Sequence, residues 1–290
     1  MPNKKRTIFT KILIWRYKYI SERQFILVLS VLVGFLAGLG TVLLKYLTLF
    51  IQSVLEGGFI RNYYFSLYFI FPIVGVWLVY LIKKNFLKKE IGHGISTTLY
   101  AISKRSGIIE RYKMFASLMV APITVGFGGS VGLQGPAVST GAAIGSNVAS
   151  MFHMNAKTRM LLIGCATAGA MSSMFKAPVA AIVFAVEIFS LDLVFTSLVP
   201  LLLASVSAVI TSYFFRGTDV LFSFELLDAW RVKDIIFYVF LGVATGIASV
   251  YFSKMYFLIT RFFAWFSNAY VKIGIAALAI GLMLYLFPPL

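Results

Sequence analysis

The chain has 290 residues, of which 60% are hydrophobic and only 12% are charged. This composition, with a mean hydropathy of +0.91, excludes a soluble globular domain and indicates a polytopic all-α membrane protein. Lys and Arg cluster between the apolar segments. The formal net charge of +16 therefore favours membrane topology and contact with anionic lipid over binding of nucleic acid.

The chain begins with a basic segment, residues 1–24, which carries seven Lys or Arg residues. Because these residues are widely spread and no short apolar core follows them, the segment does not resemble a cleavable signal peptide. The positive-inside rule predicts an interfacial helix on the cytoplasmic side. We expect a multi-pass protein of the plasma membrane, here the bacterial inner membrane, with a cytoplasmic N-terminus.

The first apolar helix is predicted over 25–56, too long for one straight span, and the second over 64–81. A polar loop is expected over 217–234. Several of the other helices are too short to cross a hydrocarbon core of about 30 Å, which is typical of transporters and channels. The remaining helices, short and long together, are predicted near 93–104, 111–124, 135–151, 157–172, 176–189, 193–215, 235–266 and 271–287.

A weak internal repeat divides the chain. Gly34 and Gly38 in the first long helix have the spacing of a small-residue packing face, and Gly242 and Gly246 repeat it in the later one. The shorter helix that follows each long one carries a glycine and then a tyrosine. This pattern predicts a first transmembrane repeat over 25–216 and the start of an inverted second repeat over 235–290, with 193–215 as the odd element between them.

A glycine-rich run with one proline, residues 126–141, interrupts the apolar sequence. Irregular backbone inside a bilayer is tolerated only where protein buries it or where it lines a wet cavity. Gln134 stands directly before Gly135 and Pro136, and a helix is expected to start there. The positive end of that helix would then point into the membrane interior, where an anion is its natural partner.

Three motifs in this order resemble the CLC family of chloride channels and proton-coupled transporters. The run Gly-Leu-Gln-Gly-Pro at 132–136 resembles the family's anion-site motif Gly-Arg/Lys-Glu-Gly-Pro. The run Gly-His-Gly-Ile at 92–95 resembles its Gly-Ser-Gly-Ile-Pro, with Ser96 in place of the proline. Residues 164–187 are similar to its Gly-Ala-Ala-Ala-Gly…Phe-Asn-Ala-Pro-Leu-Ala-Gly segment.

The resemblance implies a CLC-type inverted-repeat bundle of tilted and broken helices, assembled as a homodimer with one pore per subunit. It also implies that chloride or a similar small anion passes where helix N-termini converge. The chain resembles one half of the family fold plus the first two elements of the other, so we interpret it as truncated. The implied anion pathway comprises Gly92, His93, Gly94, Ile95, Gly132, Leu133, Gln134, Gly135 and Pro136.

Two positions bear on the mechanism. In the family, a gating glutamate precedes the Gly-Pro pair, where this chain has Gln134. An amide has neither the charge nor the titration of a carboxylate, so Gln134 should behave as a permanently protonated gate. Alternatively, Gln134 has no gating role and only caps the turn. The family's double-glutamate segment corresponds to Glu187, an accessory acid, and Ile188, which cannot carry a proton.

The histidines and the cysteine leave simpler alternatives open. His93, in place of the family serine, either donates a hydrogen bond to the anion or bonds a backbone carbonyl. His153 is expected to be exposed and Cys165 to pack in a helix. No metal site and no cofactor are expected from so few ligands.

These observations predict passive anion conduction rather than proton-coupled exchange. A fluoride-selective relative and a residual proton-coupled transporter remain alternatives. Two further alternatives belong to other classes: a non-conducting pseudo-channel, and an intramembrane enzyme that uses Ser130. The enzyme is disfavoured because neither histidine offers an evident base for that serine.

Overall fold

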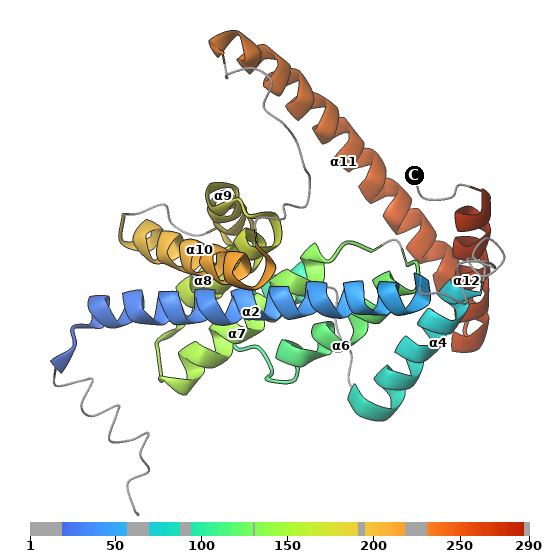
Figure 1. The fold of residues 1–290 in the computed structure, drawn as a ribbon, viewed down its shortest axis with the longest axis horizontal. Helices are drawn as coiled ribbons and strands as arrows, with labels where there is room; N and C mark the ends of the chain where they lie inside the picture. Colours follow the sequence, from blue (N-terminus) through green and yellow to red (C-terminus); the bar gives the residue numbers. More distant parts are fainter. Residues whose placement is uncertain are drawn as a thin grey trace, which may run out of the picture.

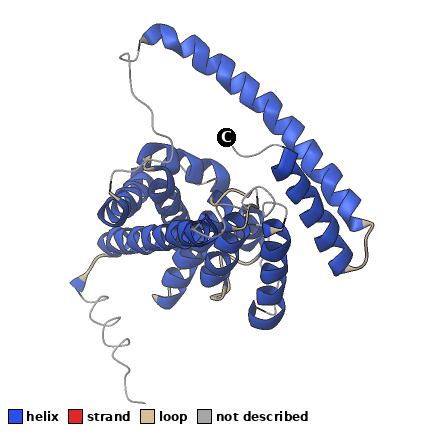
Figure 2. Ribbon diagram, turned by 45° about the vertical axis from the view of Figure 1, so that its right-hand side comes forward, coloured by secondary structure: helices blue, strands red, loops and turns tan. Residues whose placement is uncertain are grey.

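The computed structural model describes residues 19–56, 70–87, 94–129, 131–190, 195–217 and 231–286. These residues form ten α-helices, which confirms the all-α prediction (Figures 1 and 2). A π-helical turn (Lys83–Leu87) follows α4, and a 3₁₀ turn (Val232–Asp234) precedes α11. The α-helices are α2 (Glu22–Glu56), α4 (Phe71–Ile82), α5 (Ile95–Lys104), α6 (Lys113–Gly126), α7 (Gln134–Met151), α8 (Ala156–Phe175), α9 (Pro178–Phe189), α10 (Phe195–Arg216), α11 (Ile235–Ala264) and α12 (Ala269–Leu286).

The helix boundaries lie close to those predicted, and the start of α2 has a local cause. Ser21 Oγ accepts a hydrogen bond from the Gln24 backbone N–H at 3.4 Å, and Gln24 Oε1 accepts one from the Ser21 N–H at 3.3 Å. This reciprocal capping starts the helix at Glu22, three residues before the predicted position. The predicted interfacial helix over 1–24 and the predicted loop over 217–234 fall mainly outside the described residues.

The core of the bundle is α8, which contacts α2, α7, α9 and α10. Its residues 162–174 are all buried, and most of them are small. Small residues allow backbones to meet: a Cβ added at Gly145 of α7 would lie only 2.4 Å from the Leu162 carbonyl oxygen of α8. Cys165 is buried here, as expected, with its Sγ 3.8 Å from Ser30 Oγ.

Helix α10 packs along α2 by the same principle. A Cβ at Gly34 would lie 2.3 Å from the Ala204 carbonyl oxygen, and one at Gly38 would lie 3.0 Å from the Ala208 Cα. The predicted packing face of the first long helix is therefore occupied by α10. The corresponding Gly242 and Gly246 of α11 have no atom within 4 Å of an added Cβ among the described residues.

Helix α12 and the last part of α11 lie at one end of the molecule. Helix α11 extends away from the bundle and has no buried residue, whereas α12 packs along α4 (Figure 1). The rings of Tyr80 in α4 and Tyr270 in α12 are in edge contact, with centroids 5.5 Å apart. The predicted second helix is thus described from Phe71 onward, with residues 64–69 outside the described part.

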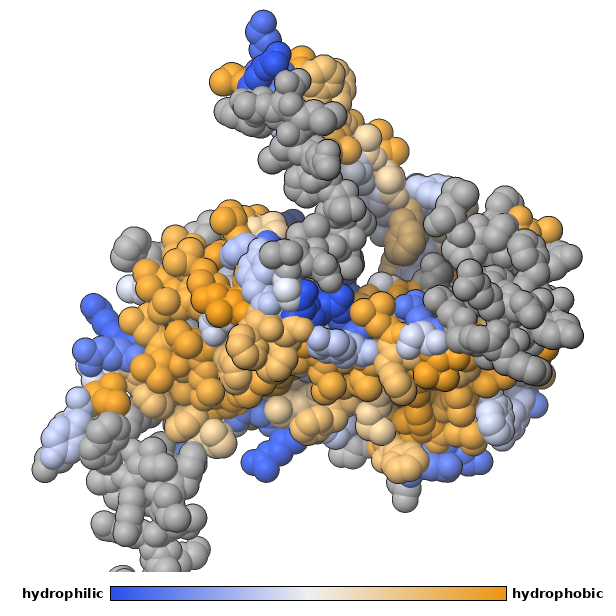
Figure 3. All heavy atoms as spheres, in the orientation of Figure 1, coloured by the Kyte–Doolittle hydropathy of each residue, from blue (hydrophilic) through white to orange (hydrophobic). Residues whose placement is uncertain are grey.

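Three helices of the described residues are long and apolar enough to cross a membrane, namely α2, α10 and α11. Hydrophobic residues cover much of the face over α2 and α10 (Figure 3). Helices α6, α9 and α12 are apolar but shorter. This mixture of long and short apolar helices agrees with the broken-helix arrangement expected from the sequence.

Candidate anion site

The first turns of α5 and α7 meet inside the molecule. A Cβ added at Gly94, directly before α5, would lie 3.3 Å from the Gly135 carbonyl oxygen in the first turn of α7. Gly94 also has a φ of +49°, which disfavours any side chain at this position. The backbone therefore requires glycine where the two short helices approach each other.

A cavity of about 680 Å³ lies at this meeting point. The two helix starts contribute Gly94, Ile95, Gly132, Gly135 and Pro136 to its wall. The amide N–H groups in the first turn of a helix have no acceptor within the helix, and the helix dipole is positive there. Two such ends at one cavity favour a negatively charged occupant.

The remaining wall adds hydroxyl groups and no charged side chain. Among the described lining residues, Ser96 belongs to α5, Ser117 and Thr124 to α6, and Ser253 and Tyr256 to α11. Thr124 Oγ1 donates to the Val120 carbonyl at 3.0 Å, so its hydrogen is already used within α6. The wall is otherwise mostly apolar, with side chains of Val120, Ala121, Val131, Phe252 and Phe257. The few free O–H donors of this neutral lining can contact a small anion without holding it through a full counter-charge.

Gln134 is the first residue of α7, with Leu133 as its N-cap. The prediction that a helix starts at the Gly-Pro pair was one residue off, because the helical turn already includes Gln134 and places Pro136 third. The Ala137 N–H donates to the Leu133 carbonyl at 3.0 Å, which closes this first turn. The Gln134 side chain is exposed, and its Oε1 lies 3.6 Å from a Cβ built on the cavity-lining Gly132.

The other predicted site residues lie elsewhere. Leu133 packs against the main hydrophobic core, and Ile188 of α9 packs against a second core cluster. Glu187 is exposed on α9, and neither it nor Ile188 lines the cavity. Gly92 and His93 fall outside the described residues, so the two readings of His93 both remain open. His153 is exposed, as expected.

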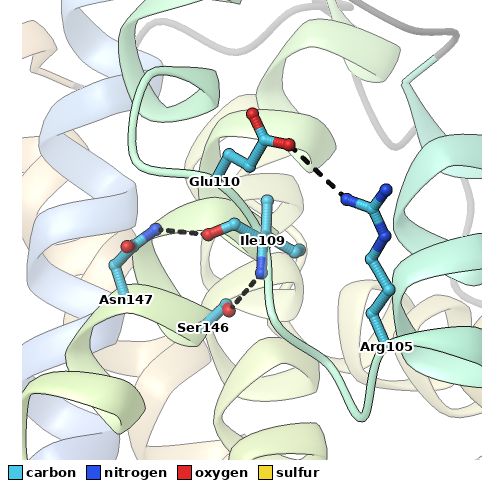
Figure 4. Close-up of polar contacts among 5 residues, drawn as sticks. All are labelled: Arg105, Ile109, Glu110, Ser146 and Asn147. Atoms are coloured by element: carbon cyan, nitrogen blue, oxygen red, sulfur yellow. Dashed lines mark hydrogen bonds and ion pairs between the residues drawn. The ribbon is translucent and has the colours of Figure 1, made fainter.

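A polar clamp holds the chain between α5 and α6 against α7 (Figure 4). Ser146 Oγ accepts a hydrogen bond from the Ile109 N–H at 2.9 Å and donates one to the Gly107 carbonyl at 2.6 Å. Asn147 Nδ2 donates to the Ile109 carbonyl at 3.2 Å, and Arg105 and Glu110 form an exposed ion pair at 3.5 Å. The clamp anchors the end of α5 to α7, and so helps fix where the start of α5 meets the start of α7.

Sequence reasoning missed the hydroxyl-bearing residues of α6 and α11. Thr124 stands two residues before the glycine-rich run, so its position was a usable signal. Ser253 and Tyr256 lie more than a hundred residues away and belong to no motif. Only the position of α11 beside the cavity brings them to this wall.

The described helices and the cavity define the class: an integral membrane protein of packed and broken helices, in which two helix N-termini line an uncharged cavity. The comparison with family models is specific. The chain belongs to the voltage gated chloride channel family, whose model matches residues 75–290.

Relatives include both channels and exchangers. The chain is 27% identical over 192 residues to chloride channel protein CLC-e of Arabidopsis thaliana, covering 63% of this chain and 26% of that one. It is 25% identical over 248 residues to the H(+)/Cl(-) exchange transporter ClcA of Vibrio cholerae, covering 79% of this chain and 51% of that one. The chain thus spans about half the length or less of these curated relatives.

Two solved structures share the fold. A CLC-type fluoride/proton antiporter aligns with a TM-score of 0.74 at 22% identity, over 97% of this chain and 67% of its own. A slow cyanobacterial Cl-/H+ antiporter aligns with a TM-score of 0.73 at 19% identity, over 93% of this chain and 65% of its own. The predicted CLC-type helical membrane fold is therefore confirmed.

Proposed function

We propose that this chain forms part of a CLC-type anion channel that conducts chloride or a similar small anion passively, without coupled proton transport. The observation that carries the proposal is the uncharged cavity between the first turns of α5 and α7. Helix dipoles and hydroxyl groups attract an anion there, and no carboxylate in the described lining competes with it.

Two substitutions favour conduction over exchange. An ionised carboxylate about 4 Å from an anion repels it by about 4 kcal/mol at an effective dielectric constant of 20. Gln134 does not itself line the cavity, but it directly precedes the lining residue Gly135, its Oε1 lies 3.6 Å from a Cβ built on Gly132, and it carries no such charge at any pH. Ile188, at the position of the family's internal proton carrier, has no titratable group. Neither residue offers a step for a transported proton.

The proposal is tested by reconstituting the full-length protein in liposomes and recording chloride and proton fluxes together. We expect chloride efflux without proton movement. Gln134→Glu is expected to lower chloride efflux at pH 7 by about tenfold or more, because the repulsion far exceeds the 1.4 kcal/mol that a tenfold change requires. Efflux should recover towards pH 4, where an ordinary glutamate is largely protonated.

Gln24→Glu is the matched control. Gln24 also lies in the first turn of a helix, and glutamate supports the same capping arrangement. Neither sequence neighbour of Gln24 lines the cavity, whereas Gln134 directly precedes the lining residue Gly135. Chloride efflux through the Gln24→Glu variant should equal that of the wild type. Chloride movement at a fixed ratio to protons in the wild type, or a pH-independent Gln134→Glu variant, would refute the mechanism while leaving the family assignment intact.

The same preparation separates the alternatives. Fluoride efflux that greatly exceeds chloride efflux would indicate the fluoride-selective relative. A folded protein that passes no anion would indicate a non-conducting pseudo-channel. We propose a transport role and no enzymatic one; Ser130, the candidate nucleophile of the enzymatic alternative, falls outside the described residues.

We also propose the arrangement in the membrane. The basic segment over 1–24 would lie on the cytoplasmic side of a bacterial inner membrane, and two subunits would associate as a homodimer. The first repeat would span 25–216 and the inverted second repeat would begin at 235 and include α11 and α12. The equal spacing of the glycine pairs in α2 and α11 supports this division, although among the described residues the first pair alone contacts a neighbouring helix.

A further inference from the structure

A second cavity, remote from the anion site, lies where four helix ends meet: the starts of α2, α8 and α10 and the end of α9. Its volume is about 480 Å³, within the range of about 300–1,000 Å³ that is usual for sites of small organic ligands. Apolar side chains form its body, among them Ile26, Leu27, Leu161, Phe189 and Pro200. The cavity can therefore accept a hydrocarbon chain.

Two cations line the same cavity. Arg23 lies in the first turn of α2 and Lys157 in the first turn of α8, and both side chains are exposed. None of the described lining residues is acidic. The cavity thus combines an apolar body with a positively charged edge, which complements an amphiphile with an anionic head group.

The position of Lys157 is itself unfavourable without an anion, whereas Arg23 follows the acid Glu22 in the first turn of α2. A positive side chain in the first turn of a helix is repelled by the positive end of the helix dipole. The first turn of α8 contains no acid that would compensate Lys157. A bound phosphate would neutralise both cations and would also meet the hydroxyls of Thr196 and Ser197 at the start of α10, which line the same cavity.

Arg23 lies where a long apolar helix begins, and Lys157 lines the same cavity from the start of the buried helix α8. Helices α2 and α10 are long enough to cross a membrane, and their first turns mark the level at which lipid head groups are found. In Figure 3, hydrophilic residues gather at the end of the molecule where α2 begins, beside an extensive apolar surface. A lipid can therefore place its phosphate at the charged edge and one acyl chain in the cavity.

We propose that this cavity binds one anionic phospholipid, with Arg23 and Lys157 contacting its head-group phosphate and the apolar wall holding an acyl chain. Attraction of about 1 kcal/mol for each basic residue near an anionic surface predicts a preference of about tenfold or more for phosphatidylglycerol over phosphatidylcholine. The proposal uses no residue of the anion cavity and does not depend on the mode of conduction.

The test is native mass spectrometry of the full-length protein titrated with dioleoyl phosphatidylglycerol or dioleoyl phosphatidylcholine. The variant Arg23→Gln/Lys157→Gln should lose the preference for phosphatidylglycerol, and the charge-conserving Arg23→Lys/Lys157→Arg should retain it. Lys104→Gln/Arg111→Gln removes the same charge from exposed positions outside the cavity and should leave the preference unchanged. Leu27→Trp, which fills the apolar body, should weaken binding of both lipids.

Glycerol phosphate distinguishes a lipid from a free phosphate. It carries the anionic group without acyl chains, so it should compete for the site at least about a hundredfold more weakly than phosphatidylglycerol, since burying methylene groups contributes most of the binding free energy. Competition at similar concentrations would overturn the lipid assignment. Retention of the preference in the double glutamine variant, or its equal loss in the Lys104/Arg111 control, would overturn the site.

Discussion

Removal of the Ser146 hydroxyl should loosen the clamp between α7 and the chain that connects α5 to α6. Ser146 is fully buried and Ile109 is 7% exposed, so Ser146→Ala leaves the Ile109 N–H and the Gly107 carbonyl buried without their partner. Each buried polar group that loses its hydrogen bond costs about 1–3 kcal/mol. Allowing for partial relaxation of the loop towards water, we expect a loss of about 2–4 kcal/mol in the free energy of unfolding.

Ser150→Ala supplies the matched control. Ser150 lies one turn further along α7, and its hydroxyl bonds only the Ser146 carbonyl of its own helix, at 2.8 Å. That carbonyl keeps its place in the helix, so the loss should stay below about 1 kcal/mol. The two variants are compared by unfolding in mixed detergent micelles, followed by circular dichroism. Equal losses for both serines would refute the reasoning that the clamp, rather than the helix, depends on Ser146.

Unfolding in mixed micelles also tests two glycines and one helix cap. Gly145→Ala should destabilise by about 1–3 kcal/mol, because its Cβ would lie 2.4 Å from the Leu162 carbonyl oxygen, whereas Gly242→Ala, with open space around it, should stabilise by about 0.5–1 kcal/mol through helix propensity. The change in the free energy of unfolding, measured in micelles, should have opposite signs for the two variants. Destabilisation by Gly242→Ala would show that this face of α11 is covered in solution. Asn155→Ala should cost about 1 kcal/mol, because Asn155 Oδ1 caps α8 by accepting from the Thr158 N–H at 2.8 Å. Asn155→Asp should restore the stability in the same assay, and no recovery would argue against a capping role.

Local sequence determined which segments are helical, because apolar length, glycine breaks and prolines act over a few residues. The glycine pair of α2 even predicted a packing face, and α10 occupies it. The wall of the anion cavity was harder to foresee. Its glycines follow from the motif, but Ser253 and Tyr256 reach it only through the placement of α11. Such a placement depends on packing between distant helices, which leaves no local pattern.

The position of Gln134 illustrates the same limit. The sequence identified the helix start to within one residue, since proline favours the first turn of a helix. Whether the amide points into the cavity or beside it depends on the path of the preceding glycine-rich backbone. Glycine permits many such paths, so the sequence alone does not select among them.

The glycines at the centre of the bundle also decide which parts can move. Where α2 meets α10 and α7 meets α8, backbone lies directly against backbone, with no flexible side chain between to absorb a shift. These four helices form a rigid frame that can move only as one body. Any change in the width of the anion cavity must therefore come from α5, α6 or α11, the lining helices that lie outside this frame. The frame fixes the start of α7 in the cavity wall, and the lining helices outside the frame set the width of the cavity.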